Sequence, residues 1–354
     1  MKISKKVKRR CILALAALLA LPCLGLMQTQ AAKGIDPGKE CSLTVSADIG
    51  GTAAGNGDYM EDFKRMAIPV SVYRVADVDI TGQQFTPVQA FSEMDFTKIN
   101  GGSDSVSAAD WQVLAEEAEA IRKASLPEAA SSVEVRCTDD GAGVAQGVLT
   151  GLSTGLYLVV ADATYSPDYT VEYHFAPYLT ALPSSEYTLE STGDEEWVYD
   201  TTIGLKPDPV PQYGKLNITK ILRDYNQTLG QATFVFHIVG VDRFGVTQYE
   251  EVESMTFTAA GSNTITLENI PAGLTVTVTE VYSGASYEVE GKNSDTALIW
   301  SGAAVSAGVS QEASVTFTNR YNGGNRGGYG VTNHFASDGN GGWTWENPTT
   351  PPGQ

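Results

Sequence analysis

The sequence predicts a mainly β protein with two tandem β-sandwich domains, the first of which contains one inserted helix. Short runs rich in Val, Thr, Tyr and Leu recur along most of the chain, and turn residues separate them, as in all-β folds. One segment, residues 108–124, instead spaces its apolar residues as a helix does. A proline cluster at Pro207–Pro211 divides the β-rich chain into two parts of domain size.

The first 32 residues have the layout of a secretory signal peptide. Lys and Arg crowd the first ten positions, an apolar run extends from Cys11 to Met27, and Ala31-Ala32 supplies small residues for cleavage. A lipoprotein signal acylated at Cys23 is the alternative, although Pro22 fits its cleavage site poorly. No later apolar run approaches the length of about 20 residues that spans a bilayer. We therefore expect a secreted protein with no membrane span in the mature chain.

The chain is strongly acidic. It has 42 Asp and Glu against 23 Lys and Arg, a net charge of −19 at pH 7, and loss of the cationic signal peptide makes the remainder more negative. Such a surface repels phosphate backbones, so we expect no nucleic-acid partner. The acidic charge is explained by the solubility that an exported protein needs.

Residues 33–206 are expected to form the first domain. In its helical segment, Trp111, Leu114, Ala118 and Ile121 recur on one face amid glutamates, which indicates an amphipathic helix. The rest is expected to be β structure. The predicted strands are Ser42–Ala47, Ile68–Val78, Val133–Cys137, Gly155–Ala161, Tyr173–Ala181 and Trp197–Leu205.

Two cysteines remain after the signal peptide, Cys41 and Cys137. Each lies in the apolar phase of a strand-like run, so both side chains are expected to point into one core. A disulfide between them can persist in an exported protein, and closing so long a loop is worth about 4–5 kcal/mol. Two separately buried thiols are the alternative.

Residues 207–214 are expected to form a short, stiff connector, because proline restricts the backbone and removes hydrogen-bond donors. The second domain, 215–321, is expected to be a β-sandwich that is Ig-like or prealbumin-like, as is the first. Residues 322–354, rich in Gly, Asn, Pro and Thr, are expected to form a flexible tail. The predicted strands of the second domain are Leu216–Leu222, Thr233–Val241, Ser254–Thr258, Asn263–Leu267, Leu274–Tyr282, Tyr287–Val289 and Ala313–Tyr321.

Three strands of the second domain each carry one polar residue on an otherwise apolar face. Alternate residues of a strand share a face. Burying an isolated ammonium or carboxylate costs several kcal/mol, so we expect these groups to be paired, neutralised or reacted. Lys220 shares a face with Leu216, Ile218 and Leu222. Glu280 shares a face with Val276, Val278 and Tyr282, and Asn319 shares one with Val315, Phe317 and Tyr321.

These three residue types are sufficient for one reaction. Burial favours the neutral amine of Lys220 and the protonated form of Glu280. The amine can then attack the side-chain carbonyl of Asn319, while Glu280 transfers the proton and ammonia leaves. Each residue alone also has an ordinary interpretation: a lysine whose head reaches solvent, a glutamate at an exposed strand end, or an asparagine in a turn.

The segments that carry these residues occur in a familiar order. Leu-Asn-Ile-Thr-Lys, ending at Lys220, Ile-Pro-Ala-Gly-Leu-Thr-Val-Thr-Val-Thr-Glu, ending at Glu280, and Val-Thr-Phe-Thr-Asn, ending at Asn319, resemble the collagen-adhesin B-type domains of Gram-positive surface proteins and pilins. The resemblance spans about Lys215 to Tyr321. It implies an intramolecular isopeptide bond between Lys220 and Asn319, with Glu280 as the catalytic acid and base.

The first domain resembles the N-terminal domain of sortase-assembled pilins, through the segments Tyr73–Val78, Gly151–Val159, Phe175–Leu179 and Trp197–Asp200. That family places a pilin-motif lysine just after this domain, where a sortase joins it to the C-terminus of the next subunit. Lys206 occupies the corresponding place and is the candidate. Its surroundings keep only the lysine and a nearby proline, so an ordinary interdomain lysine is the other interpretation.

The first domain lacks the residues for a similar crosslink. Its first predicted strand, Ser42–Ala47, has no lysine and its last, Trp197–Leu205, has no asparagine, so we expect no isopeptide bond there. Sortase substrates of this type end in a Leu-Pro-x-Thr-Gly motif, an apolar helix and a basic tail. None follows Tyr321, which leaves the mode of anchoring open, and Asn347–Thr350 is interpreted as part of a Pro- and Thr-rich linker.

We therefore expect a structural protein of the cell surface or cell wall, a pilin-like subunit of a bacterial fibre whose partners are a sortase and neighbouring pilin subunits. A monomeric surface adhesin is the alternative. It binds a host protein or glycan, and the insertion between Asp79 and Val133 is where such a ligand is expected.

An enzymatic function has less support. A secreted glycoside hydrolase needs two opposed carboxylates, but Asp139, Asp140, Glu195 and Glu196 lie in turn-like segments typical of a solvated face. The three histidines, His174, His237 and His334, are scattered and show no metal-ligand spacing. We expect no metal, no cofactor and no catalysis beyond one self-crosslinking event.

Overall fold

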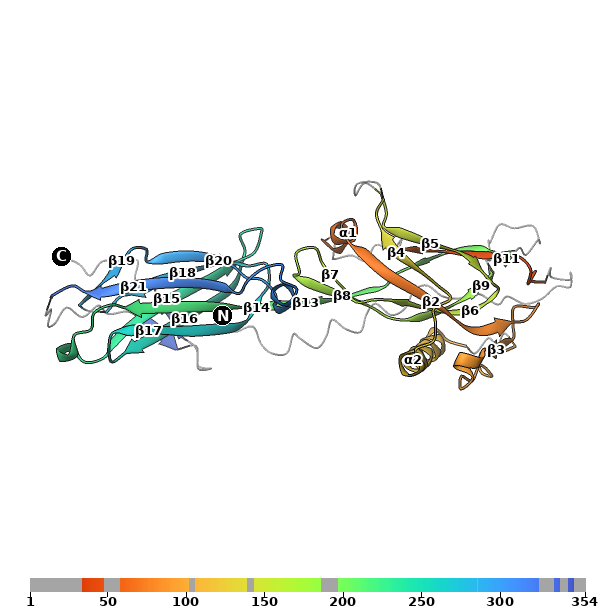
Figure 1. The fold of residues 1–354 in the computed structure, drawn as a ribbon, viewed down its shortest axis with the longest axis horizontal. Helices are drawn as coiled ribbons and strands as arrows, with labels where there is room; N and C mark the ends of the chain where they lie inside the picture. The colour runs from red at the N-terminus through yellow and green to blue at the C-terminus, as the bar shows by residue number, and fades with distance from the viewer. Residues whose placement is uncertain are drawn as a thin grey trace. The chain divides into compact units, whose positions relative to one another are not determined.

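A computed structural model describes residues 34–47, 58–101, 106–138, 143–185, 197–284, 286–324, 334–337 and 343–346. The predicted signal peptide lies outside these residues. The described chain forms two compact units. The N-terminal unit comprises residues up to Pro167 together with Tyr173–Val210, and the C-terminal unit comprises Asp168–Glu172 and the residues from Pro211 onward. Both are built mainly from β-sheets (Figure 1), as the sequence predicts.

In the described residues, the N-terminal unit is organised around one eight-stranded sheet. Its strand order is β12-β1-β5-β4-β2-β6-β9, and β3 pairs with β2. The strands are β1 (Cys41–Ser46), β2 (Ala67–Val78), β3 (Phe85–Pro87), β4 (Ser131–Arg136), β5 (Gln146–Leu152), β6 (Gly155–Ala161), β9 (Tyr178–Leu182) and β12 (Asp200–Gly204).

The described chain up to Pro211 also forms smaller elements. Strands β13, β8 and β7 form a three-stranded sheet, and β10 pairs with β11. The predicted stiff connector therefore contributes a strand of its own, β13. The bounds are β7 (Thr164–Tyr165), β8 (Val171–Phe175), β10 (Ser184–Ser185), β11 (Trp197–Val198), β13 (Pro207–Pro211), helix α1 (Asp58–Phe63) and a 3₁₀ turn at Gln89–Phe91.

The inserted helix is α2 (Ala108–Ser125), and it packs on the sheet beside β6 and β9 (Figure 1). Ser107 and Asp110 form a capping box that satisfies exposed amides at its start. Leu114 and Ala118 are buried against the sheet, so the apolar face read from the sequence is the packed face. The prediction of an inserted helix at residues 108–124 is confirmed, and the short helix α1 was not predicted.

The C-terminal unit is a sandwich of two four-stranded sheets, in the order β17-β14-β21-β19 and β16-β15-β18-β20. Phe234, Phe236, Ile218, Val278 and Phe317 fill the core between them. The bounds are β14 (Tyr213–Leu222), β15 (Ala232–Val241), β16 (Thr247–Phe257), β17 (Gly261–Pro271), β18 (Thr275–Tyr282), β19 (Tyr287–Glu290), β20 (Ser294–Leu298), β21 (Ala313–Tyr321), a 3₁₀ turn at Gln227–Leu229 and helix α3 (Gly302–Ser306).

In each unit, a strand near the start of its sequence pairs side by side and in parallel with a strand near its end. In the N-terminal unit β1 pairs with β12, and in the C-terminal unit β14 pairs with β21. Parallel neighbours cannot be joined by a tight hairpin, so these pairs form only when the intervening chain has folded. The pairing brings residues that are distant in sequence onto adjacent strands.

Several elements differ from the sequence prediction. The run Tyr173–Ala181 is two strands, because Pro177 cannot donate to a ladder and lies between β8 and β9. Strands β5 and β20 were not predicted, since glycine interrupts the first and polar residues dominate the second. Within the predicted flexible tail, β22 (His334–Ser337) pairs with β23 (Trp343–Glu346).

The predicted disulfide is wrong, since Cys41 and Cys137 are both free. Strand β5 lies between β1 and β4, the strands that carry or precede the two cysteines. Cys41 pairs with Leu152 of β5, whereas Arg136 pairs with Gln146, so the cysteines are offset by about 20 Å along the sheet. A disulfide requires Cα atoms within about 7 Å. Burial raises the pKa of the Cys41 thiol to about 11, which keeps it protonated.

Candidate functional site

The candidate site is assembled from three strands of the C-terminal sandwich. Lys220 lies on β14 and Asn319 on the adjacent strand β21, where Lys220 pairs with Phe317 and Asn319 with Leu222. Because the two residues are offset by two positions on neighbouring strands, both side chains point into the core. Glu280 lies on β18 of the opposing sheet, with its side chain also directed inward.

All three side chains are removed from solvent. Lys220 and Asn319 are 0% exposed and Glu280 is 5% exposed. The ring of Phe234 lies 4.6 Å from the Lys220 Nζ atom, and the ring of Phe236 lies 6.0 Å from it. The apolar phase read from the sequence therefore corresponds to the buried face for all three polar residues.

The polar atoms form a closed network. Lys220 Nζ donates to Glu280 Oε2 at 2.6 Å and also to Asn319 Oδ1. Asn319 Nδ2 donates to Glu280 Oε1 at 2.6 Å and to the backbone carbonyl of Ser283 at 3.4 Å. Glu280 thus bridges the amine and the amide nitrogen, one with each carboxyl oxygen.

The electrostatics favour a neutral pair. Burial lowers the pKa of Lys220 below the usual lysine range, although the hydrogen bond and charge of Glu280 oppose this shift. Burial likewise raises the pKa of Glu280, against the hydrogen bond and charge of Lys220. Both shifts move the proton balance toward an uncharged amine beside a carboxylic acid. That is the state in which a lysine is a nucleophile.

This arrangement can support acyl transfer from nitrogen to nitrogen. The amine contacts the oxygen of the amide that it would attack, so the Asn319 carbonyl carbon lies next to the nucleophile. Glu280 is in hydrogen-bond reach of both the nitrogen that loses a proton and the nitrogen that gains one. The surrounding phenylalanines exclude water that would compete.

Two parts of the site were not identified from the sequence. Phe234 and Phe236 lie in the apolar phase of β15, which predicts burial, but nothing local indicates that they cover Lys220. The contribution of Ser283 comes from a backbone carbonyl, which leaves no residue-type signal in a sequence.

The other predicted residues make none of the contacts of this cluster that the structure describes. Lys206 is exposed between β12 and β13. Asp139, Asp140, Glu195 and Glu196, considered for a hydrolase, lie outside the described residues. Within the part of the chain that the structure describes, no group of three or more His, Cys, Asp and Glu residues is arranged to hold a metal ion. Nor is any helix in that part long and apolar enough to cross a membrane.

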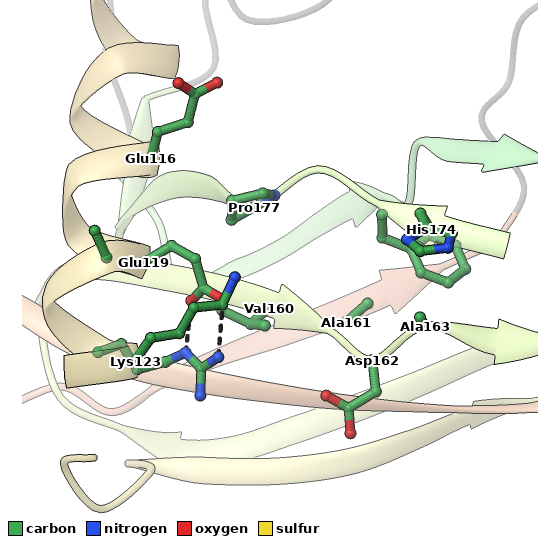
Figure 2. A pocket seen from close by; sticks show the side chains of 12 residues that line it. Glu116, Glu119, Lys123, Val160, Ala161, Asp162, Ala163, His174 and Pro177 are labelled. Carbon is green, nitrogen blue, oxygen red and sulfur yellow. Dashed lines mark hydrogen bonds and ion pairs between the residues drawn. The ribbon is translucent and has the colours of Figure 1, made fainter. Parts of the chain in front are cut away.

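A second feature of functional interest lies in the N-terminal unit, a groove of about 510 Å³ beside α2. Glu119 forms the base of one wall, where it accepts two hydrogen bonds from Arg122, at 2.5 and 2.8 Å. Figure 2 shows α2 on one side of the groove and the end of β6 with the β8–β9 segment on the other. Among the residues that line it are Glu116, Lys123, Asp162, His174, Phe175 and Pro177.

Comparison with known families identifies part of the C-terminal unit. Residues 216–322 match the family described as a domain of unknown function (DUF5979). The matched region contains Lys220, Glu280 and Asn319. No curated protein sequence matches the chain.

Solved structures of bacterial pilins match most of the chain at low identity. The minor pilin of Streptococcus agalactiae is 12% identical, with coverage of 79% of this chain and 96% of that one and a TM-score of 0.23. The major pilin SpaD of Corynebacterium diphtheriae is 11% identical, with coverage of 82% and 100% and a TM-score of 0.25. The basal pilin SpaE of Lactobacillus rhamnosus GG is 12% identical, with coverage of 75% and 85% and a TM-score of 0.27.

Proposed function

We propose that this protein is a pilin-like structural subunit of a bacterial surface fibre, and that its C-terminal unit stabilises itself with an intramolecular Lys220–Asn319 isopeptide bond. The observation that carries the proposal is the buried network in which Glu280 bridges the amine and the amide nitrogen. A carboxyl group would be enough to pair a buried lysine, whereas here the Asn319 amide also places an acyl group against the amine and within reach of the same carboxyl group.

The reaction is balanced without any co-reactant. The neutral Lys220 Nζ attacks the Asn319 Cγ atom, and a new C–N bond forms. Glu280, protonated at the start, donates its proton to Nδ2 and takes up the proton that Nζ releases, so it ends the reaction as it began. The Cγ–Nδ2 bond then breaks and ammonia leaves, so that an amide replaces an amine and a primary amide. The product is uncharged, and it removes the cost of keeping a potential ion pair buried.

The position of the bond suits a mechanical function. Tension on the C-terminal unit enters at the start of β14 and leaves at the end of β21, and these strands are parallel neighbours. A bond from Lys220 to Asn319 carries the tension directly between them. The chain between these residues, which are 99 positions apart, is then not under load.

Intact mass tests the crosslink. The mature wild-type protein is expected to weigh less than its sequence by one ammonia molecule, whereas Glu280→Gln and Lys220→Met are expected to keep the full mass of their sequences. Glu119→Gln is the matched control, because Glu119 is also a buried carboxylate but is paired with Arg122. A wild-type mass equal to that of the sequence contradicts the proposal.

Assembly into a fibre uses Lys206 as the acceptor for a sortase, which joins it to the C-terminus of a neighbouring pilin subunit. Support comes from its exposure and its place between β12 and β13, close to the end of the N-terminal unit. On denaturing gels of surface extracts we expect a ladder that Lys206→Ala abolishes and that Lys215→Ala, at another exposed lysine, preserves. A ladder that persists in Lys206→Ala assigns the linkage to another residue.

The groove beside α2 favours a second candidate function, adhesion to a host protein or glycan. It lies against the insertion between Asp79 and Val133, and carboxylate, ammonium and imidazole side chains are among those that line it (Figure 2). Binding of the wild-type protein to immobilised host matrix proteins and glycans, lost in Lys123→Glu and kept in Lys98→Glu, supports this function. Lys98 is an exposed control that does not line the groove.

A further inference from the structure

The side-chain amide of Asn319 has a fixed orientation. Its oxygen accepts from Lys220 Nζ, and its nitrogen donates to Glu280 Oε1 at 2.6 Å and to the Ser283 carbonyl at 3.4 Å. An amide nitrogen has two hydrogens, which is enough for these two acceptors. Rotating the amide by half a turn would place its oxygen against the Ser283 carbonyl, and two acceptors cannot bond each other.

Glu280 alone cannot maintain this orientation through the reaction. As a carboxylate it only accepts, and it selects the amide nitrogen. As a carboxylic acid it also donates, and it can then bond the amide oxygen as readily. The proposed mechanism passes through that protonated form. A backbone carbonyl, by contrast, is an acceptor in every protonation state of the site.

We propose that the Ser283 carbonyl is a positioning group for the crosslinking reaction, which holds Asn319 Nδ2 away from Lys220 and thereby keeps the carbonyl carbon turned toward the attacking amine. This inference rests on the proposed Lys220–Asn319 bond. It goes further by assigning the leaving nitrogen its own acceptor, outside the three residues that react.

The position of this carbonyl is set by the turn that follows β18. Gly284 has a φ of +82°, a conformation that side chains disfavour. A Cβ atom at Gly284 would lie 3.0 Å from the Tyr287 ring. Tyr287 is buried and packs edge-on against Phe234, the ring that covers the Lys220 amine. Gly284 therefore packs against Tyr287, which contacts the Phe234 ring that covers the Lys220 amine.

The same turn is also tied to the strand that carries Asn319. The amide of Asn322, just after β21, donates to the Ser286 carbonyl at 3.0 Å. Ser286 is 1% exposed. Gly284 on one side and Ser286 on the other are thus held by contacts near Asn319, which is what a positioning group requires.

The leaving group fits this assignment. When Nδ2 receives its third hydrogen from Glu280 and becomes ammonia, the hydrogen already bonded to the Ser283 carbonyl stays in place. Ser283 and Gly284 are half-buried, whereas Glu280 and Lys220 are buried. The Ser283 side is therefore the less enclosed side of the amide, and the ammonia leaves there.

Gly284→Ala tests the proposal, with Gly291→Ala as its matched control. Both glycines have positive φ, +82° and +98°, in turns beside β19, but a Cβ at Gly291 meets nothing within 4 Å. Chains made by cell-free synthesis are quenched at intervals and weighed. We expect ammonia loss to be about fivefold slower in Gly284→Ala, as for one lost hydrogen bond, and unchanged in Gly291→Ala. Equal slowing in both variants, or none in Gly284→Ala, overturns the proposal.

A second measurement separates positioning from folding. In the Lys220→Met background no crosslink forms, and NMR can follow solvent exchange of the Asn319 side-chain amide. We expect one amide hydrogen to lose protection when Gly284→Ala is added and both to keep it when Gly291→Ala is added. Unchanged protection in the first case removes Ser283 from its assigned role. A wild-type chain that never loses ammonia refutes the proposed crosslink instead, and this exchange measurement is still interpretable.

Discussion

The two units of the chain share one feature, a parallel pairing of an early strand with a late one, which we call the closure. They differ in the side chains that are buried at this closure. In each unit an early strand pairs in parallel with a late one, β1 with β12 and β14 with β21. At this closure the N-terminal unit buries Leu43 and Val45, whereas the C-terminal unit buries Lys220 and Asn319. The same strand pairing therefore exists with and without Lys220, Glu280 and Asn319. The proposed crosslink depends on these three side chains and is not required by the strand order.

The units also treat their buried carboxylates differently. In the N-terminal unit Glu119 is paired with Arg122 of the same helix, one turn away. In the C-terminal unit Glu280 faces a lysine and an amide from the opposite sheet. An arginine holds its proton and cannot attack a carbonyl, whereas a desolvated lysine can. An ion pair is the outcome in one unit and a covalent bond is the proposed outcome in the other.

The largest expected effect comes from making the C-terminal unit resemble the N-terminal one. The double variant Lys220→Met with Glu280→Leu removes the crosslink and leaves no buried charge. By analogy with a disulfide that closes a similar loop, we expect a loss of about 4–5 kcal/mol in the unfolding free energy of the C-terminal unit. Calorimetry measures this loss, and the transition of the N-terminal unit serves as the internal control. Equal stability of the double variant and the wild type would show that no covalent tie is present.

The converse change places a lysine at the N-terminal closure. Leu43→Lys buries an ammonium on β1. The carboxylate of Asp200 on the adjacent strand is not available to pair with it, because it accepts a hydrogen bond from Ser42, whose side chain lies on the other face of the sheet. We expect the N-terminal unit to lose about 3–5 kcal/mol, as for an unpaired buried charge, and to gain no crosslink. Chemical denaturation measures the loss, and Leu43→Met is the control, at under about 1.5 kcal/mol. A Leu43→Lys protein that loses ammonia would contradict the view that closure alone is insufficient.

The pH dependence of crosslinking gives an intermediate effect. Burial lowers the pKa of Lys220 and raises that of Glu280, and both shifts favour the reactive neutral pair. Acid adds a proton to this pair and removes the nucleophilic lone pair. We expect the rate of ammonia loss to fall by about tenfold for each pH unit below the pKa of that protonation. Timed intact masses measure the rate, and peptide mapping should assign the loss to the C-terminal unit at every pH. A rate that rises in acid is incompatible with an amine nucleophile.

The smallest effect is expected from a reducing agent. Because Cys41 and Cys137 are free, reduction should leave the unfolding temperature of the N-terminal unit unchanged. Thermal unfolding with and without reductant measures this, and Cys137→Ser is the companion variant. A lower unfolding temperature under reducing conditions would mean that the unit is held by a disulfide after all.

Local periodicity was enough to predict much of the candidate site. Alternation along each strand assigned Lys220, Glu280 and Asn319 to inward faces, and all three are buried. The helix at 108–124 was predicted for the same reason, since its apolar spacing is contained in the segment itself. Periodicity specifies a face and a type of element, because both depend only on near neighbours in sequence.

The cysteines show where that reasoning ends. Cys41 was correctly assigned to a buried face, but burial in one core does not imply contact. The sheet order places β5 between the two segments, and its register offsets them along the strands. Strand order is set by which whole strands pack together, and a local pattern carries no information about it.

The sequence by itself determined the residue types, the buried faces and the resemblance that points to a crosslink. Only the tertiary structure decided that Lys220 and Asn319 lie on adjacent parallel strands, that Glu280 reaches them from the opposing sheet, and that the Ser283 carbonyl meets the amide. The physical reason is that alternation is imposed by each strand's own backbone. Register, sheet facing and the position of a turn arise from the packing of the whole sandwich.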